Sequence, residues 1–179
     1  IHGQELSFAV SSCPTVEGER ITIEAVGGAL KAVELPDLGI RPDDLLAHAL
    51  KSALAKCPGL DPAVIEDVIV GCAMPEAEQG MNVARIGLLL AGFPNTVSGM
   101  TINRFCSSGT QAVALAADRI RLGEAEVMVA AGTESMSMVP MGGQKPSFSP
   151  AIFESNENVA IAYGMGITAE KVAAQWKVS

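Results

Sequence analysis

Apolar residues recur at helical spacing in four stretches of the chain. The first helix is predicted to begin at Pro42, since proline suits a first helical turn, and to end near residue 57. The second is predicted to begin after Asn82, whose side chain can cap it, and to end at residues 93–95. The third follows residue 106 and ends near Gly123, and the last is predicted to begin at a Thr168 cap.

Three short strands are predicted between these helices, at 65–73, 98–103 and 127–131, and the first and the last of them are largely apolar. Continuous apolar character is typical of strands that are buried on both faces. Strand and helix alternate in the order that builds a parallel sheet with helices on its faces. The pattern therefore predicts a layered α/β domain.

The segment before Arg41 has a weaker pattern. Residues 6–10 and 21–26 each resemble a strand, and we consider a hairpin across Gly18, with a turn at residues 27–28. After Ser135 the periodicity is lost, and Gly, Pro, Ser and Asn are frequent as far as residue 157. This composition predicts a long loop or the start of an inserted subdomain.

Composition and charge exclude several classes of function. The chain has 179 residues, 49% of them hydrophobic, which is enough for one domain with a substantial core. Its 12 Lys and Arg against 20 Asp and Glu give a net charge of -8, so we expect no nucleic-acid partner. No apolar run approaches the length of a membrane span, so none is predicted.

Four cysteines occur, at positions 13, 57, 72 and 106, without a Cys-x-x-Cys pair. Only His2 and His48 are available to complete a metal site, so the prediction is that no metal is bound. The composition and the lack of a signal peptide favour free thiols in a reducing compartment, and the expected location is the cytoplasm, of bacterial type.

Cys106 is the cysteine with candidate chemistry, because it lies where a predicted strand leads into a predicted helix. Unpaired N–H groups and the positive end of the helix dipole favour a thiolate at this position. The Gly- and Ala-rich helix that follows is predicted to be central and buried. A dependable nucleophile also needs a base, and no motif connects His48 to Cys106. From position alone, Cys106 is either a nucleophile or an inert core residue, whereas Cys57 and Cys72 are expected to be inert.

The segment Asn103-Arg104-Phe105-Cys106-Ser107-Ser108-Gly109 resembles the nucleophile signature of thiolases. Three further segments resemble thiolase segments in the same order, and the resemblance covers about residues 41–179: Gly71-Cys72-Ala73-Met74-Pro75-Glu76 with Gln79-Gly80-Met81-Asn82-Val83-Ala84-Arg85, Gly132-Thr133-Glu134-Ser135-Met136-Ser137, and Met165-Gly166-Ile167-Thr168-Ala169-Glu170. Residues 11–20 depart from the family, which usually has an Arg-Thr-Pro-x-Gly turn there.

This resemblance implies a layered α-β-α fold with a mostly parallel mixed sheet and a buried central helix. It implies an amino-terminal domain at residues 1–138, the start of an inserted loop domain at 139–179, and the absence of the carboxy-terminal domain, with its activating His and second Cys. It also implies thiolytic cleavage of a 3-ketoacyl-CoA, or the reverse condensation, with Cys106 as the acyl-accepting nucleophile and its backbone N–H in an oxyanion hole.

Coenzyme A and acyl-CoA are then expected as substrates, with no permanently bound cofactor, and the full-length protein is expected to be a homodimer or tetramer. The substrate-binding residues stay unassigned. Met136, Met138 and Met141 are interpreted as packing around an acyl chain or, preferably, as core residues. The expected role is in fatty-acid breakdown, and the alternatives are a biosynthetic acetoacetyl-CoA thiolase or a catalytically incompetent half-domain that only dimerises or packs.

Overall fold

The computed structural model describes residues 41–156 and 158–178, together with five short strands between residues 8 and 34. The chain divides into two compact units, residues 1–144 and residues 145–179. The assignment of residues 139–179 to an inserted loop domain stays a prediction.

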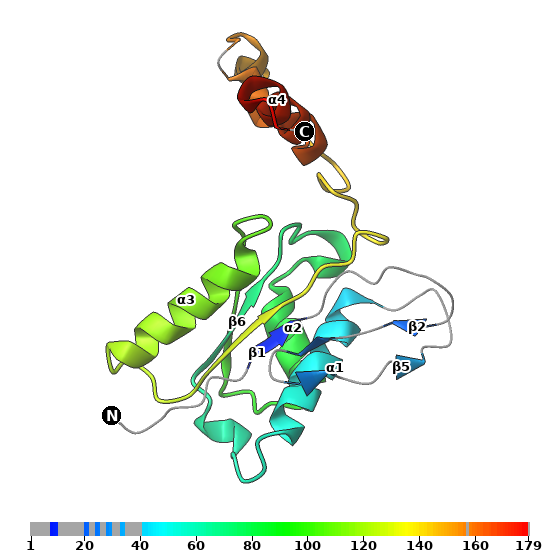
Figure 1. The fold of residues 1–179 in the computed structure, drawn as a ribbon. Helices are drawn as coiled ribbons and strands as arrows, with labels where there is room; N and C mark the ends of the chain where they lie inside the picture. The colour runs from blue at the N-terminus through cyan, green and yellow to red at the C-terminus, as the bar shows by residue number, and fades with distance from the viewer. Residues whose placement is uncertain are drawn as a thin grey trace. The chain divides into compact units, whose positions relative to one another are not determined.

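The first unit is built on one four-stranded sheet in the order β1-β8-β6-β7 (Figure 1). Its strands are β1 (Phe8–Val10), β6 (Asp67–Gly71), β7 (Ser98–Ile102) and β8 (Met128–Gly132). All three pairings are parallel. The expected sheet was mostly parallel and mixed, whereas antiparallel pairing among the described strands occurs in two separate ribbons, β2 (Arg20–Ile21) with β5 (Val33–Glu34) and β3 (Glu24–Ala25) with β4 (Gly28–Ala29).

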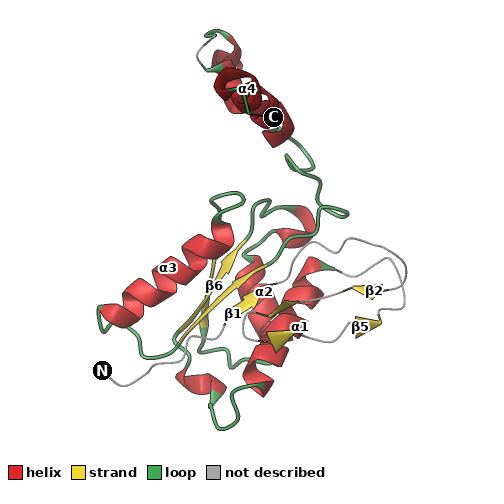
Figure 2. Ribbon diagram, in the orientation of Figure 1, coloured by secondary structure: helices red, strands yellow, loops and turns green. Residues whose placement is uncertain are grey.

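Helices cover both faces of this sheet, which confirms the layered α/β prediction (Figure 2). Helices α1 (Pro42–Ala55) and α2 (Val83–Leu90) pack on one face, and α3 (Ser108–Arg121) packs on the other. The short helices η1 (Pro62–Val64) and η2 (Ala77–Gln79) lie in the loops that precede and follow β6.

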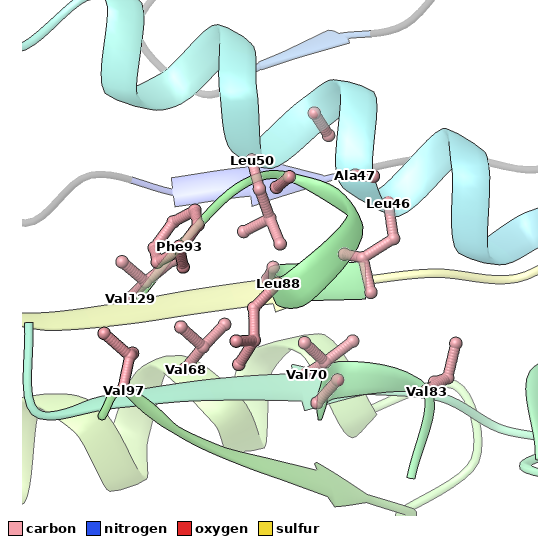
Figure 3. Packing of buried hydrophobic residues seen from close by; sticks show 14 of the residues in the cluster. Leu46, Ala47, Leu50, Val68, Val70, Val83, Leu88, Phe93, Val97 and Val129 are labelled. Atoms are coloured by element: carbon pink, nitrogen blue, oxygen red, sulfur yellow. The ribbon is translucent and has the colours of Figure 1, made fainter. Parts of the chain in front are cut away.

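Side chains of β6 alternate between the two faces, as a strand requires. Val68 and Val70 point into the core under α1 and α2, beside Leu50 and Leu88 (Figure 3), whereas Ile69 packs against α3. The strand is buried along its whole length. This position between two helical layers explains why its sequence is apolar without alternation.

Helix α3 is buried on one side only. Ser108, Ala112 and Ala116 are buried against the sheet, whereas Thr110 and Ala114 on other sides of the helix are exposed. The small residues on the buried side allow the helix to lie close to the strands. The predicted burial of this helix therefore holds for the face toward the sheet.

Three local predictions were wrong. The strand at residues 8–10 pairs with β8 and not in a hairpin across Gly18. Asn82 precedes α2 but makes no capping bond, because its side chain bonds O of Gly99 and Oγ1 of Thr101 instead. Helix α4 (Met165–Trp176) begins before Thr168, whose hydroxyl bonds the carbonyl of Gly164.

The second unit contains η3 (Pro150–Phe153), η4 (Val159–Ala162) and α4. The rings of Phe148 and Phe153 meet edge to face with centroids 6.5 Å apart. Nζ of Lys171 lies 5.0 Å from the ring centroid of Tyr163. None of the residues described in α4 is buried within this chain.

Candidate active site

Cys106 lies in the turn between the carboxyl end of β7 and the first residue of α3. Its thiol is exposed and is not in a disulfide. The fourteen-residue helix begins two residues later, at Ser108, with basic side chains in its last turn. A negative charge on the sulfur would therefore lie near the positive end of the α3 dipole.

The turn that carries Cys106 has an unusual backbone conformation. Phe105 has φ +44°, in the left-handed region that favours glycine, and its side chain is 63% exposed. Its N–H donates to Oδ1 of Asn103 at 2.8 Å. Such a conformation persists only where the surroundings hold it, and in this turn side-chain hydrogen bonds hold it.

Ser108 is the main brace of this turn. Its buried Oγ accepts a hydrogen bond of 2.8 Å from N–H of Arg104 and donates one of 2.6 Å to O of Phe105. These two bonds close the turn around Cys106 from the inside. The thiol consequently projects from a fixed frame and not from a loose loop.

A buried hydrogen-bond network lies at the same edge of the sheet. Nε2 of Gln79 donates to Oε1 of Glu134 at 2.6 Å and to O of Met74 at 2.8 Å, and its Oε1 accepts from N–H of Ser135 at 2.5 Å. The other carboxylate oxygen of Glu134 accepts from N–H of Ala73 at 2.7 Å. The network joins the loop after β6 to the loop after β8.

These contacts bring together segments that the sequence analysis singled out separately. The segments at 71–76, 79–85 and 132–137 meet through Gln79 and Glu134, and Gly71 contacts the start of α3 beside the Cys106 turn. The fourth segment, 165–170, lies in the second unit. Gln79 is the first residue of one of these segments, but a single glutamine in a loop gives no signal that its side chain is buried and bonded to Glu134.

The other cysteine on this sheet has a different environment. Cys72 is buried, and burial, with a smaller effect from the charge of Glu134, raises the pKa of its thiol to about 12. Nε2 of Gln79 lies 3.4 Å from its sulfur. Cys72 therefore lies in the core, as predicted, and its burial favours the protonated thiol.

His48 and the methionines that follow β8 were also considered from the sequence. His48 is exposed on α1, which packs on the face of the sheet opposite α3. Met136 is 39% exposed and Met141 is 65% exposed, so the interpretation of these two residues as core was wrong for this chain. The described part of the chain contains no group of three or more His, Cys, Asp or Glu side chains that could hold a metal ion.

The parallel sheet with helices on both faces, and the braced turn that places an exposed cysteine just before α3, define a layered α/β domain. Residues 14–179 match the family model described as the thiolase N-terminal domain, and the chain belongs to the thiolase family. None of the helices that the structure describes is long and apolar enough to cross a membrane.

Curated relatives agree with this family. A 3-ketoacyl-CoA thiolase of Bacillus subtilis (strain 168) is 46% identical over 140 residues, covering 78% of this chain and 35% of the relative. A 3-oxoadipyl-CoA/3-oxo-5,6-dehydrosuberyl-CoA thiolase of Escherichia coli (strain K12) is 41% identical over 177 residues, covering 91% of this chain and 42% of the relative. The chain thus spans well under half the length of these relatives.

Proposed function

We propose that this chain supplies the nucleophile of a coenzyme A-dependent acyltransferase, with Cys106 as the residue that accepts the acyl group. The observation that carries the proposal is the exposed Cys106 thiol at the start of α3, in a turn closed by Ser108. Family membership and relatives named 3-ketoacyl-CoA thiolase support this chemistry.

In the proposed reaction, the Cys106 thiolate attacks the keto carbonyl carbon of a 3-ketoacyl-CoA. The bond between the α- and β-carbons breaks, the two-carbon fragment takes up a proton and leaves as acetyl-CoA, and the shortened acyl group remains as a thioester on Sγ. The thiol of a second coenzyme A then attacks this thioester, which yields acyl-CoA and returns a proton to the enzyme. The reverse sequence is a condensation of two acyl-CoA molecules.

Charge develops on the carbonyl oxygen during the attack and needs hydrogen-bond donors. We assign one donor to the backbone N–H of Cys106, because this residue lies just before α3, where the positive end of the helix dipole stabilises negative charge. By family resemblance, we assign the base that activates the thiol and the acid that protonates the leaving fragment to a carboxy-terminal part of the protein. Coenzyme A enters and leaves as a substrate, and a dimer or tetramer is the expected assembly.

The direct test is intact-mass measurement after incubation with acetyl-CoA, with Cys106→Ala as the control and Cys72→Ala as the matched thiol variant. The native full-length protein and the Cys72→Ala variant should each gain one acetyl group, and Cys106→Ala should gain none. The same adduct on Cys106→Ala, or thiolysis of acetoacetyl-CoA by that variant, would refute the assignment.

The same experiment tests the alternative that this chain is a catalytically incompetent half-domain. Residues 1–179 produced alone would then fold without gaining an acetyl group, while the native full-length protein would gain one. An adduct on residues 1–179 alone would show that the start of α3 and its turn suffice for the first step. The comparison of acetoacetyl-CoA with longer 3-ketoacyl-CoA substrates separates the biosynthetic from the degradative subtype.

A further inference from the structure

Gly71, the last residue of β6, lies against the backbone at the start of α3. A Cβ atom at this position would lie 2.4 Å from the carbonyl carbon of Ser108, 2.5 Å from N of Gly109 and 2.6 Å from O of Ser108. Favourable contacts between carbon atoms are about 3.5–4.0 Å. All three neighbours are backbone atoms, which cannot rotate away as a side chain can, so the contact requires glycine.

Gly71 is held in place from both sides of its strand. It is in register with Ile102 of β7 and with Gly132 of β8. Its carbonyl oxygen accepts a hydrogen bond of 3.0 Å from N–H of Thr133, and the next residue, Cys72, donates one of 3.0 Å to O of Ile102. A larger residue at Gly71 would therefore displace the start of α3 and not the central strand.

Ser108 transmits such a displacement to Cys106. Its backbone forms the surface that touches Gly71, and its Oγ closes the turn through Arg104 and Phe105. A shift of the Ser108 backbone by about 1 Å, the distance needed to restore an ordinary contact, breaks or bends both of these bonds. Cys106, which lies between the bonded residues and Ser108, then moves as well.

We propose that Gly71 is a positioning residue for Cys106: the missing side chain sets how closely the first turn of α3 approaches β6, and thereby fixes the sulfur at the carboxyl edge of the sheet. The catalytic consequence rests on the proposed function, whereas the effect on the reactivity of Cys106 does not. Gly71 itself touches no reacting atom in this proposal.

Gly132 provides a matched control on the neighbouring strand. It is the register partner of Gly71 at the end of β8, and among the described residues a Cβ atom on it would meet only O of Gly71, at 3.6 Å, an ordinary contact. Alanine at either position adds the same methyl group at the same level of the sheet. Only the variant at Gly71 meets the start of α3.

The experiment compares Gly71→Ala and Gly132→Ala in the native full-length protein. It measures kcat and KM for acetoacetyl-CoA thiolysis, the rate of Cys106 alkylation by iodoacetamide, and Tm. Gly71→Ala should lower kcat and the alkylation rate roughly 10- to 100-fold with KM changed less than about threefold, because a misplacement of about 1 Å acts on the reacting group and not on ligand binding. Gly132→Ala should keep both rates within about threefold of native.

Native kcat and alkylation in a folded Gly71→Ala variant would overturn the proposal, and so would an equal loss in Gly132→Ala. If Gly71→Ala does not fold, Ser108→Ala removes the hydrogen bonds that connect Ser108 to the Cys106 turn without adding a side-chain atom. Slower alkylation of Cys106 in a folded Ser108→Ala variant supports the proposal, and alkylation at the native rate overturns it. Thiolysis by Cys106→Ala would refute the proposed function alone, because the alkylation results would still stand.

Discussion

Nε2 of Gln79 donates a hydrogen bond of 2.6 Å to Oε1 of Glu134, and this bond connects two loops that lie 55 residues apart in the sequence. Gln79 is fully buried, so water does not compensate for the loss of its partners. The glutamine amide both donates and accepts, which allows it to bond a carboxylate, a carbonyl and an N–H group together.

The variant Gln79→Leu tests this network. Leucine has a similar size but leaves Oε1 of Glu134, O of Met74 and N–H of Ser135 without their present partner. We expect a loss of about 2–4 kcal/mol in the free energy of unfolding, because several polar groups lose their hydrogen bonds at one buried site. Urea-induced unfolding followed by circular dichroism measures this loss.

Gln144→Leu is the matched control for that substitution. Gln144 is exposed, and its Nε2 makes one side-chain bond, of 2.6 Å, to O of Met138. We expect a change within about 0.5 kcal/mol, since water can replace that bond. Equal effects of the two variants would contradict the importance assigned to the buried network.

A second prediction concerns stability at alkaline pH. The folded state raises the pKa of Cys72 from an ordinary value of 9.0 to about 12. Above pH 9 the unfolded thiol loses its proton while the folded thiol keeps it, so the contribution of Cys72 to stability is complete below pH 9 and is lost as the pH rises toward 12. The slope approaches about 1.4 kcal/mol per pH unit.

The measurement is the free energy of unfolding at several pH values between 8 and 11, about one unit apart, for the native chain and for Cys72→Ala. The alanine variant should lose less stability with rising pH, although it is less stable at neutral pH because a buried side chain is truncated. Other groups that titrate in this range cancel in the difference between the two curves. Parallel curves would show that burial does not hold the proton on Cys72.

A third prediction concerns the ion pair between Arg119 of α3 and Asp67 of β6. Their Nη1 and Oδ2 atoms are 2.9 Å apart, and the Asp67 side chain is only 12% exposed. Arg119→Leu leaves this carboxylate without its cation, and we expect a loss of about 1–3 kcal/mol in the free energy of unfolding, reduced by the partial exposure of the arginine.

Arg121→Leu, on the same helical turn, is the control. Arg121 pairs with Asp118 at 3.6 Å, and both side chains are largely exposed. Pairs of this kind contribute about 0–1 kcal/mol, so the expected change is smaller than at Arg119. Chemical unfolding of the two variants side by side gives the comparison, and a larger effect at Arg121 would be incompatible with the ranking by burial.

The sequence predicted those parts of the fold that depend on local pattern. The apolar periodicity after Pro42 and the continuous apolar run of β6 correspond to a helix and a strand in the structure. The partner of the strand at residues 8–10 was not predictable in this way. Phe8 pairs with Ala130, and the sequence around residue 8 does not indicate which distant strand it pairs with. A hairpin was the nearest local solution, and it was wrong.

The candidate site shows the same division. Cys106 was identified as the candidate nucleophile from its place between a strand and a helix, together with the amino-acid sequence of the segment around it. The contact of Gly71 with Ser108 and the hydrogen bond of Gln79 with Glu134 join residues far apart in the chain. Both residues stand in segments that resemble thiolases, but glycine and glutamine are common in loops for other reasons, so only the distances show which contacts they make.

The last prediction uses the contrast between the exposed thiol of Cys106 and the buried thiol of Cys72. Iodoacetamide should modify Cys106 at least about 100-fold faster at neutral pH, because alkylation needs both access and a thiolate. Peptide mass mapping after timed quenching gives both rates, and Cys106→Ala shows whether Cys72 reacts only after Cys106. In Gln79→Leu, where the contact of the amide with the Cys72 sulfur is lost, Cys72 should react faster while Cys106 changes less. Equal rates in the native protein would contradict the prediction. They would mean that the buried Cys72 is as accessible to the reagent as the exposed Cys106, although the hydrogen bonds of Gln79 close the end of β6.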